Sequence, residues 1–217
     1  MGVKTEMQFI DKLRFGGLSH CGSVPLETER LILRRFRAAD AAAMYANWAD
    51  DPDVTRYLVW RAHWNVRETE EVIRYWESQY HRKDFYEWAI VPKSLGVPIG
   101  SIGVTKIKGM KTVMEFGYCI GKSWWGNGIC AEASMAVLDL MFHRVGCTGM
   151  IAMHALPNVS SGRVMEKCGM TPKDCPPEPV RTENGKFYCR VYELSRERFE
   201  DVQADKQKAT ARVAPTA

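Results

Sequence analysis

Short hydrophobic runs separated by polar turns predict a chain built from strands and helices in alternation. The runs rich in β-branched and aromatic residues favour strands, and the turns between them contain glycine, proline or lysine. Strands are expected over residues 30–36, 85–91, 98–107, 112–120, 149–156 and 186–194. The three strands between residues 85 and 120 are joined by short connections, which predicts an antiparallel meander.

Helices are predicted where hydrophobic residues recur every three to four positions instead of every second position. They are expected over residues 41–48, 66–80, 128–144 and 160–168. Asp40 can cap the first of these helices through its side chain, and Gly169 can end the last. A strand, a helix and a strand between residues 112 and 156 imply a right-handed crossover, so these two strands should pair in parallel.

This order of elements indicates a single domain with an α+β (mixed α/β) fold. Its sheet is expected to be twisted and mostly antiparallel, with six to seven strands and with helices on both faces. The 217 residues leave room for one domain of ordinary size. We place it at residues 25–199, between an N-terminal extension over 1–24 and a disordered polar tail over 200–217. The proline-rich segment 171–185 is expected to be a loop at the rim of a pocket.

Composition and charge exclude several classes of function. No apolar run approaches the roughly 18 residues that a membrane helix needs, so no contact with a membrane is expected. The first residues mix charged with apolar side chains and do not resemble a secretory signal, which indicates a cytoplasmic protein. The net charge of +4 is spread along the chain. A charge spread in this way is weak evidence for a nucleic-acid partner, and none is expected. It fits either an anionic ligand or an ordinary basic surface.

The cysteines predict neither disulfides nor a metal site. The chain has seven, an odd number, and no Cys-x-x-Cys pair occurs among them, which is typical of reduced thiols. His143 and Cys147 are four residues apart, but no second pair completes the four ligands of a zinc site. No metal is therefore expected.

The sequence SWWGNGICAEA, residues 123–133, places two glycines between a predicted strand and a predicted helix. The start of a helix presents unpaired N–H groups and the positive end of the helix dipole, which together suit a phosphate group. The turn has neither the Walker pattern nor the Gly-x-Gly-x-x-Gly pattern of dinucleotide-binding folds. Taken alone, it fits a phosphate site and an ordinary loop equally well.

A second segment, NVSSGRVMEKCGM at residues 158–170, follows the next predicted strand. Together the two segments resemble the GNAT superfamily of acyl-CoA-dependent N-acetyltransferases. The resemblance extends from ETERLILRRF at residues 27–36 to the last predicted strand, and it is greatest to ribosomal-protein N-acetyltransferases of the RimJ/RimL type. It implies a GNAT-like domain that uses acetyl-CoA (coenzyme A) as its co-substrate and acetylates a primary amine.

The resemblance assigns the glycine turn to the coenzyme. In this family, backbone amides of the signature Gln/Arg-x-x-Gly-x-Gly/Ala hold the diphosphate of coenzyme A. The corresponding residues are Trp125, Gly126, Asn127, Gly128, Cys130 and Ala131. Trp125 replaces the usual Gln or Arg, and Cys130 replaces the usual Gly or Ala. These departures leave the binding site intact, because its chemistry lies in the main chain.

Five further residues are implied to contact the coenzyme. Tyr118, Cys119 and Ile120 should end a strand whose exposed backbone pairs with the pantetheine arm, although the same residues would also suit an ordinary core strand. Asn158 matches the start of the family's Asn-x-x-Ser-x-Arg pattern and is expected to contact the coenzyme. Arg163, the last residue of that pattern, either faces the coenzyme or is a surface charge.

Acetyl transfer needs a group that removes a proton from the amine, and Glu115 is the candidate base. A partly buried carboxylate has the raised proton affinity that this role requires; the alternative is an ion pair with a basic residue on a neighbouring strand. Ser161 is the candidate that supports the leaving thiolate, unless it only caps its helix. A cysteine nucleophile at Cys119 or Cys130 is not expected, since no histidine is evidently paired with either.

The acceptor is expected near residues 57–68, where Trp60, His63 and Trp64 would frame a slot for an amine or would pack against the core. The sequence leaves three functions open. The first is acetylation of a primary amine, either a peptide N-terminus or a small molecule. The second is a coenzyme A-binding sensor without turnover, and the third is an accessory factor that contacts RNA. A second copy of the chain, forming a homodimer, is a further candidate partner.

Overall fold

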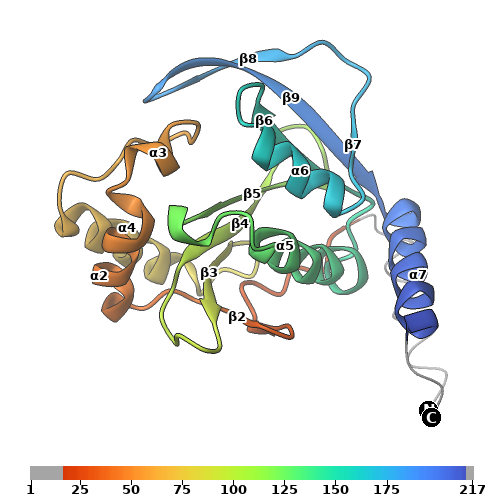
Figure 1. Cartoon of the computed structure of the whole chain (residues 1–217), viewed down its shortest axis with the longest axis horizontal. Helices are drawn as coiled ribbons and strands as arrows, with labels where there is room; N and C mark the ends of the chain where they lie inside the picture. Colours follow the sequence, from red (N-terminus) through yellow and green to blue (C-terminus); the bar gives the residue numbers. More distant parts are fainter. Residues whose placement is uncertain (1–16, 214–217) are drawn as a thin grey trace.

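A single nine-stranded sheet organises the computed structural model, which describes residues 17–213 (Figure 1). Its strand order is β1-β2-β3-β4-β5-β6-β9-β7, and β8 also pairs with β9. The strands are β1 Leu26–Glu27, β2 Leu31–Arg34, β3 Tyr86–Pro92, β4 Gly100–Lys106, β5 Val113–Ile120, β6 Gly149–Ala155, β7 Thr171–Pro172, β8 Glu178–Thr182 and β9 Gly185–Ser195.

The helices lie between these strands in sequence. They are α2 Ala41–Met44, α3 Pro52–Thr55, α4 Val66–Gln79, α5 Ile129–Asp139, α6 Val159–Lys167 and α7 Arg196–Val213. The π-helical turns η2 Tyr45–Ala49 and η4 Leu140–Val145 extend α2 and α5, and the 3-10 turns η1 Ala38–Asp40 and η3 Lys122–Trp124 precede them. All the helices expected from the hydrophobic period are therefore present, within a few residues of their predicted ends.

The predicted topology is confirmed, but the predicted number of strands is too low. Strands β2 to β5 form the antiparallel meander, and β5 pairs with β6 in parallel across the helical crossover. The additional strands are β1 and β7, each of two residues, and β8. Such short strands have no hydrophobic period of their own, because the neighbouring strand and not the local sequence determines their conformation.

The pairing of β5 with β6 ends early, and this determines where a ligand can enter the sheet. Only residues 113–115 of β5 are opposite β6, at residues 149–151. Beyond Glu115 the two strands diverge, whereas β4 stays paired with β5 as far as Ile120 and β9 stays paired with β6. The edge of residues 116–120 that faces β6 therefore has no neighbouring strand.

Two hydrophobic cores cover the two faces of the sheet. The larger core packs α5, η4 and α6 against one face, and the smaller core packs α2, η2 and α4 against the other. Successive residues of a strand point to opposite faces. Along β5, Met114, Phe116 and Ile120 accordingly belong to the larger core and Cys119 to the smaller one.

The proline-rich segment 171–185 is not a loop, contrary to the prediction. It contains β7 and β8, and β8 pairs with β9 through five residue pairs to form a hairpin. A proline is tolerated on an edge strand because no further strand needs its missing N–H, and Pro179 lies on such an edge. Figure 1 shows that this hairpin extends across the molecule towards α3.

Asn184, at the tip of the hairpin, attaches it to the segment that follows α3. Its side-chain amide nitrogen donates to the backbone oxygens of Thr55, Leu58 and Trp60, at 2.9, 3.1 and 2.8 Å. Nearby, the rings of Tyr57 and Phe187 meet edge to face. One side chain therefore holds a segment more than a hundred residues distant in sequence.

The ends of the domain also differ from expectation. Residues 200–213 continue α7 as a helix instead of a disordered tail, because this polar segment contains three alanines, two lysines and two glutamines, which favour helix. At the other end, Leu18, Cys21 and Val24 pack against the larger core, and residues 1–16 of the expected extension lie outside the described residues. The domain limits at residues 25 and 199 stay predictions.

Asp40 does not cap α2 through its side chain, which corrects a further expectation. Its carboxylate instead accepts two hydrogen bonds from the guanidinium of Arg34, at 2.7 and 2.9 Å, and one from the backbone N–H of Arg37. A paired carboxylate is the more stable arrangement here, since Asp40 is buried and a buried charge requires a partner.

None of the helices in residues 17–213 is long and apolar enough to cross a membrane. The seven cysteines, all within this range, carry free thiols. In the same range, no three histidine, cysteine or acidic side chains gather as they would around a metal ion.

Replacing Asn184 by alanine should free the hairpin tip, because three backbone oxygens would lose their donor at a cost of about 1–3 kcal/mol. Backbone amides of β8 and α3 should then exchange with deuterium faster, which mass spectrometry of peptic fragments can measure. Asn184→Asp keeps the shape of the side chain but lacks the donor, and it should behave like the alanine variant. Unchanged exchange in both variants would show that Tyr57 and Phe187 alone hold the tip.

Candidate active site

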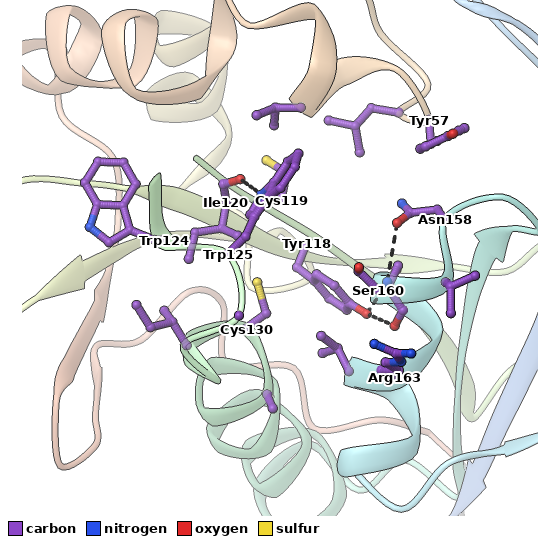
Figure 2. A pocket seen from close by; sticks show the side chains of 18 of the residues that line it. Tyr57, Tyr118, Cys119, Ile120, Trp124, Trp125, Cys130, Asn158, Ser160 and Arg163 are labelled. Carbon is purple, nitrogen blue, oxygen red and sulfur yellow. Dashed lines mark hydrogen bonds between the residues drawn. The ribbon is translucent and has the colours of Figure 1, made fainter. Parts of the chain in front are cut away.

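A pocket of about 670 Å³ opens beside the unpaired end of β5 (Figure 2). Its wall combines the end of β5, the glycine turn, the first turns of α5 and α6, and residues in and after α3. Among the predicted coenzyme-binding residues, those in the wall are Tyr118, Cys119, Ile120, Trp125, Gly126, Gly128, Cys130, Ala131, Asn158 and Arg163. Ser161 lies there too, whereas Asn127, Glu115 and the three aromatic slot residues do not.

The glycine turn presents free main-chain donors to the pocket. Gly126 and Gly128 have φ values of 80° and 74°, in the left-handed region that glycine adopts without strain. The N–H groups of residues 126–131 have no acceptor within the described protein, and the first helical bond runs from the Glu132 N–H to the Gly128 oxygen. Several unpaired donors at a helix start are the chemistry that binds a diphosphate.

Side chains around the turn hold it in this conformation. The Trp125 indole donates to the Ile120 oxygen at 2.9 Å, as Figure 2 shows, and the Asn127 amide donates to the Trp125 oxygen at 3.3 Å. Arg30 donates to the Asn127 oxygen at 3.1 Å and forms an ion pair with Glu132 at 2.6 Å. Asn127 thus stabilises the turn without lining the pocket. The role of Arg30 could not be predicted, because this residue lies almost a hundred residues away from the turn.

Tyr118 and Ser161 bring two hydroxyl groups together where β5 and β6 diverge. The Tyr118 hydroxyl donates to the Ser161 backbone oxygen at 2.8 Å and lies 3.2 Å from the Ser161 Oγ. In Figure 2 the Tyr118 ring points from β5 towards the first turn of α6. Burial raises the pKa of Tyr118 well above its usual value, so it is a hydrogen-bond donor at neutral pH.

The helix cap at this site belongs to Asn158, not to Ser161. The Asn158 side chain accepts from the backbone N–H of Ser161 at 3.4 Å, which leaves the Ser161 hydroxyl free for another role. From the sequence, Ser161 is predicted either to cap α6 or to act in catalysis, and Tyr118 is predicted to contact the coenzyme through its backbone. The hydroxyl pair could not be predicted, because it depends on the contact between β5 and α6.

Glu115 is the last residue of β5 that is opposite β6. Its cross-strand neighbours are Thr105 and Ile151, neither of which is charged, so the alternative of a facing basic residue on an adjacent strand does not apply. Its side chain points to the face that α2 and α4 cover, away from the pocket wall. Burial raises the pKa of Glu115 above its usual value, as expected for a proton acceptor in a partly buried site.

Cys119 and Cys130 lie in the pocket wall as buried thiols. Burial raises the pKa of Cys119 to about 11 and that of Cys130 still further. A thiol in this state is protonated at neutral pH and is a weak nucleophile. The protonated state of both thiols therefore favours direct attack by the acceptor over a covalent acyl-enzyme.

The three aromatic residues of the expected slot lie after α3, outside the pocket wall. Trp60 packs against the smaller core, and its ring centroid is 5.2 Å from that of His63. Burial lowers the pKa of His63, whose Nδ1 is 2.8 Å from the Thr69 hydroxyl. Trp64 is 76% exposed and carries the guanidinium of Arg61 over its ring. A role for these residues in acceptor binding stays a prediction.

Basic and apolar residues complete the pocket. Arg56, Arg163 and Lys167 add positive charge to its wall, and Val54, Tyr57 and Leu58 add apolar surface near α3. A long ligand with an anionic end and an apolar arm fits such a wall. The residues after α3 could not be predicted from the sequence, because their place at the pocket depends on the hairpin tip that holds them.

Comparison with known proteins agrees with this geometry. Residues 30–171 match the family model described as "Acetyltransferase (GNAT) domain". An N-acetyltransferase of Bacillus subtilis, YoaA, whose function is uncharacterized, is 30% identical over 144 residues, covering 66% of this chain and 81% of that protein. The uncharacterized protein YkkB of the same organism is 32% identical over 147 residues, covering 67% and 84%.

A solved structure shares the fold and contains coenzyme A. It is that of RimL, described as a ribosomal L7/L12 alpha-N-protein acetyltransferase in complex with coenzyme A. It superposes with a TM-score of 0.69 at 15% identity, covering 79% of this chain and 98% of that one. A GNAT-family acetyltransferase from Bacillus anthracis superposes with a TM-score of 0.70 at 22% identity, covering 80% and 99%.

Replacing Gly128 by valine should lower the affinity for coenzyme A about tenfold or more, because losing one charge-assisted hydrogen bond to the diphosphate costs about 1.5–3 kcal/mol. Isothermal titration calorimetry measures this directly. The matched control is Gly146→Val, which places the same side chain at another glycine of positive φ, in open space at the end of η4. Equal affinity in the two variants would contradict the role of the glycine turn.

Proposed function

The chain belongs to the GNAT acetyltransferase family and is an acetyl-CoA-dependent N-acetyltransferase; we propose that its acceptor is the primary amine of a peptide N-terminus. The unpaired edge of β5, with free main-chain donors close to it, is the observation that carries the proposal. It leaves room for an extended thioester arm whose end lies within reach of both faces of the sheet. Structures of the same fold include acetyltransferases that are named for ribosomal proteins.

The coenzyme would be held largely by the main chain. Its diphosphate would accept hydrogen bonds from the N–H groups of residues 126–131, with Arg163 adding positive charge. Its pantetheine arm would lie along the unpaired edge of residues 116–120 as an added strand. When bound, acetyl-CoA supplies an acetyl thioester, and a backbone N–H near Tyr118 to Ile120 would stabilise the negative charge that develops on its carbonyl oxygen.

The protons of the reaction would move through residues on both faces of β5. Glu115 would take a proton from the attacking amine, directly or through one water molecule. The sulfur of the departing thiolate would receive a hydrogen bond or a proton from Ser161, with Tyr118 beside it. No acyl group needs to pass to the protein, since both thiols in the wall are protonated.

Two other functions fit the same pocket. A small-molecule amine would need no more than the same carboxylate and thioester, and a sensor of acyl-CoA would need only the glycine turn. The peptide is preferred because the acceptor side has an exposed indole, Trp64, and a partly exposed arginine, Arg61, with which a chain of several residues can make contact. An acceptor of ribosomal origin is the first choice for a test.

Incubation with acetyl-CoA and a panel of amines should release free thiol above background with at least one peptide N-terminus, and more slowly with polyamines or amino acids. A thiol-reactive dye follows the release, and mass spectrometry locates the added acetyl group. Preference for a small molecule would replace the proposed acceptor. Coenzyme A binding without release for every acceptor would leave the sensor as the function.

Glu115→Gln should lower kcat about 100-fold or more, the usual range for losing a general base, while calorimetry finds coenzyme A affinity unchanged. In the wild-type enzyme, activity should fall with decreasing pH as Glu115 becomes protonated, and it should fall at a higher pH than an exposed glutamate would cause. Glu71→Gln, an exposed substitution on α4, is the control. Wild-type turnover in Glu115→Gln would remove this residue from the mechanism.

A further inference from the structure

On the sheet face that carries the smaller core, a carboxyl group covers one glycine and a second glycine leaves open space beside it. Glu87 of β3, Gly103 of β4 and Gly117 of β5 lie opposite one another in successive strands. A Cβ atom on Gly103 would overlap the Glu87 Oε2, so the Glu87 carboxyl lies directly across Gly103. A Cβ atom on the exposed Gly117 would meet no atom within 4 Å. We call this open space the Gly117 hollow.

The Gly117 hollow adjoins the pocket. Glu115 and Cys119 flank Gly117 on the same face, two residues away in each direction. Cys119 also lines the pocket, and its Sγ is 3.5 Å from the Ser101 Oγ, which in turn hydrogen-bonds the Glu87 carboxyl. Because Gly117 belongs to the unpaired part of β5, a thioester lying along that edge would end beside the hollow.

Both carboxyl groups at the hollow lack a positive partner among the described residues. No basic side chain contributes to the pKa of either Glu87 or Glu115, and burial raises both, that of Glu87 to about 8. The other groups near Glu87 are Ser101, Cys119, Ser23, whose hydroxyl accepts from the Glu87 backbone N–H at 2.9 Å, and Tyr80, whose hydroxyl donates to the Glu87 backbone oxygen at 3.1 Å. None of these carries a positive charge, so an ammonium ion would supply what the hollow lacks.

We propose that the acceptor amine binds in the Gly117 hollow and loses its two protons to two different carboxylates, first to Glu87 and then to Glu115. This rests on the proposed function, acetyl transfer to a primary amine. Glu87 would hold the ammonium form and convert it into the neutral amine. Glu115 would receive the second proton while the C–N bond forms.

Two acceptors match the proton balance of the reaction. An ammonium ion has to lose one proton before its nitrogen can attack and another to become a neutral amide. The C–N bond forms, the C–S bond breaks, and the sulfur takes one proton from the Ser161 hydroxyl. The proton on Glu115 returns to Ser161 through water, and the proton on Glu87 passes to solvent. One acetyl thioester and one ammonium ion thus give one amide, one thiol and one proton.

The burial of Glu87 suits the first of these steps. A carboxylate with an ordinary pKa of about 4.3 is a poor acceptor for a proton from an alkylammonium ion, whose pKa is about 10.4. With a pKa of about 8, Glu87 reduces this mismatch to about two units. At pH 7 the ammonium ion would bind the fraction of Glu87 that is deprotonated, and the proton would then move against a gap of about two pKa units.

Glu87→Gln should give a pH signature that a merely structural role would not give. Without Glu87, only amine that is already neutral in solution can react. At pH 7 the variant should lose about tenfold or more in kcat/KM for an alkylamine, and the loss should shrink as the pH approaches the pKa of the amine. Over the same rise in pH, where Glu115 is ionised, the loss in Glu115→Gln should stay undiminished. A Glu87→Gln enzyme with the wild-type pH profile would overturn the proposal.

Gly117→Ala tests the hollow itself. The added methyl group meets nothing in the free protein, so the thermal midpoint should stay unchanged. The KM for the amine should rise about tenfold or more, since losing even one amine hydrogen bond to a charged group costs about 1.5–3 kcal/mol. Glu71→Gln again serves as the exposed control. An unchanged KM in Gly117→Ala would place the amine elsewhere.

A titration without turnover separates this inference from the proposed function. Infrared spectroscopy of the carboxyl bands, as a wild-type minus Glu87→Gln difference, should show a group titrating near pH 8 that methylammonium shifts to lower pH. No effect of methylammonium would overturn the inference, even if the enzyme acetylates amines. A clear shift without thiol release for any amine would support the hollow and reject the proposed function.

Discussion

The early end of pairing between β5 and β6 is the constraint on which the rest of this structure depends. Main-chain groups inside a protein need partners, and residues 116–120 have them on only one side. Strand β6 does not supply the missing partners, because it follows β9 along its whole length and diverges from β5. Helices α5 and α6 both begin at the resulting gap, so two positive helix ends face the place where a strand is missing.

The proposed binding of the coenzyme through the main chain would also explain why unusual side chains are tolerated in the glycine turn. Cys130 packs into the larger core, so any small apolar side chain would serve there. Trp125 contributes by fixing the turn to the end of β5 and not by offering a charge. What the turn cannot lose is the conformation of Gly126 and Gly128, which keeps the N–H groups directed outward.

Local patterns were sufficient to predict the strands β2 to β6 and β9, the helices α2, α4, α5 and α6, the meander and the parallel crossover, since each depends on period and connection length. They did not predict α3, α7 or the strands β1, β7 and β8. The glycine turn and Ser161 could be placed at one pocket because they belong to motifs. Contacts between distant segments could not be predicted: the attachment of Asn184, the support from Arg30 and the hydroxyl of Tyr118 carry no local pattern. Glu87 was missed for the same reason, since its importance arises from two glycines on neighbouring strands.

The alternation of side chains along β5 gives this one strand two separate tasks. Tyr118 points to the side of α6, while the Glu115 side chain lies on the opposite face. In the proposed mechanism the departing sulfur would meet a hydrogen-bond donor on the first side, and the amine would meet proton acceptors on the second. In the proposed mechanism the donor and the acceptors therefore cannot neutralise each other directly, because the strand lies between them. The same burial that keeps Cys119 protonated keeps Glu87 basic. In the proposed mechanism, the low polarity around Cys119 and Glu87 would thus keep the thiol from acting as a nucleophile and would favour direct attack by the amine.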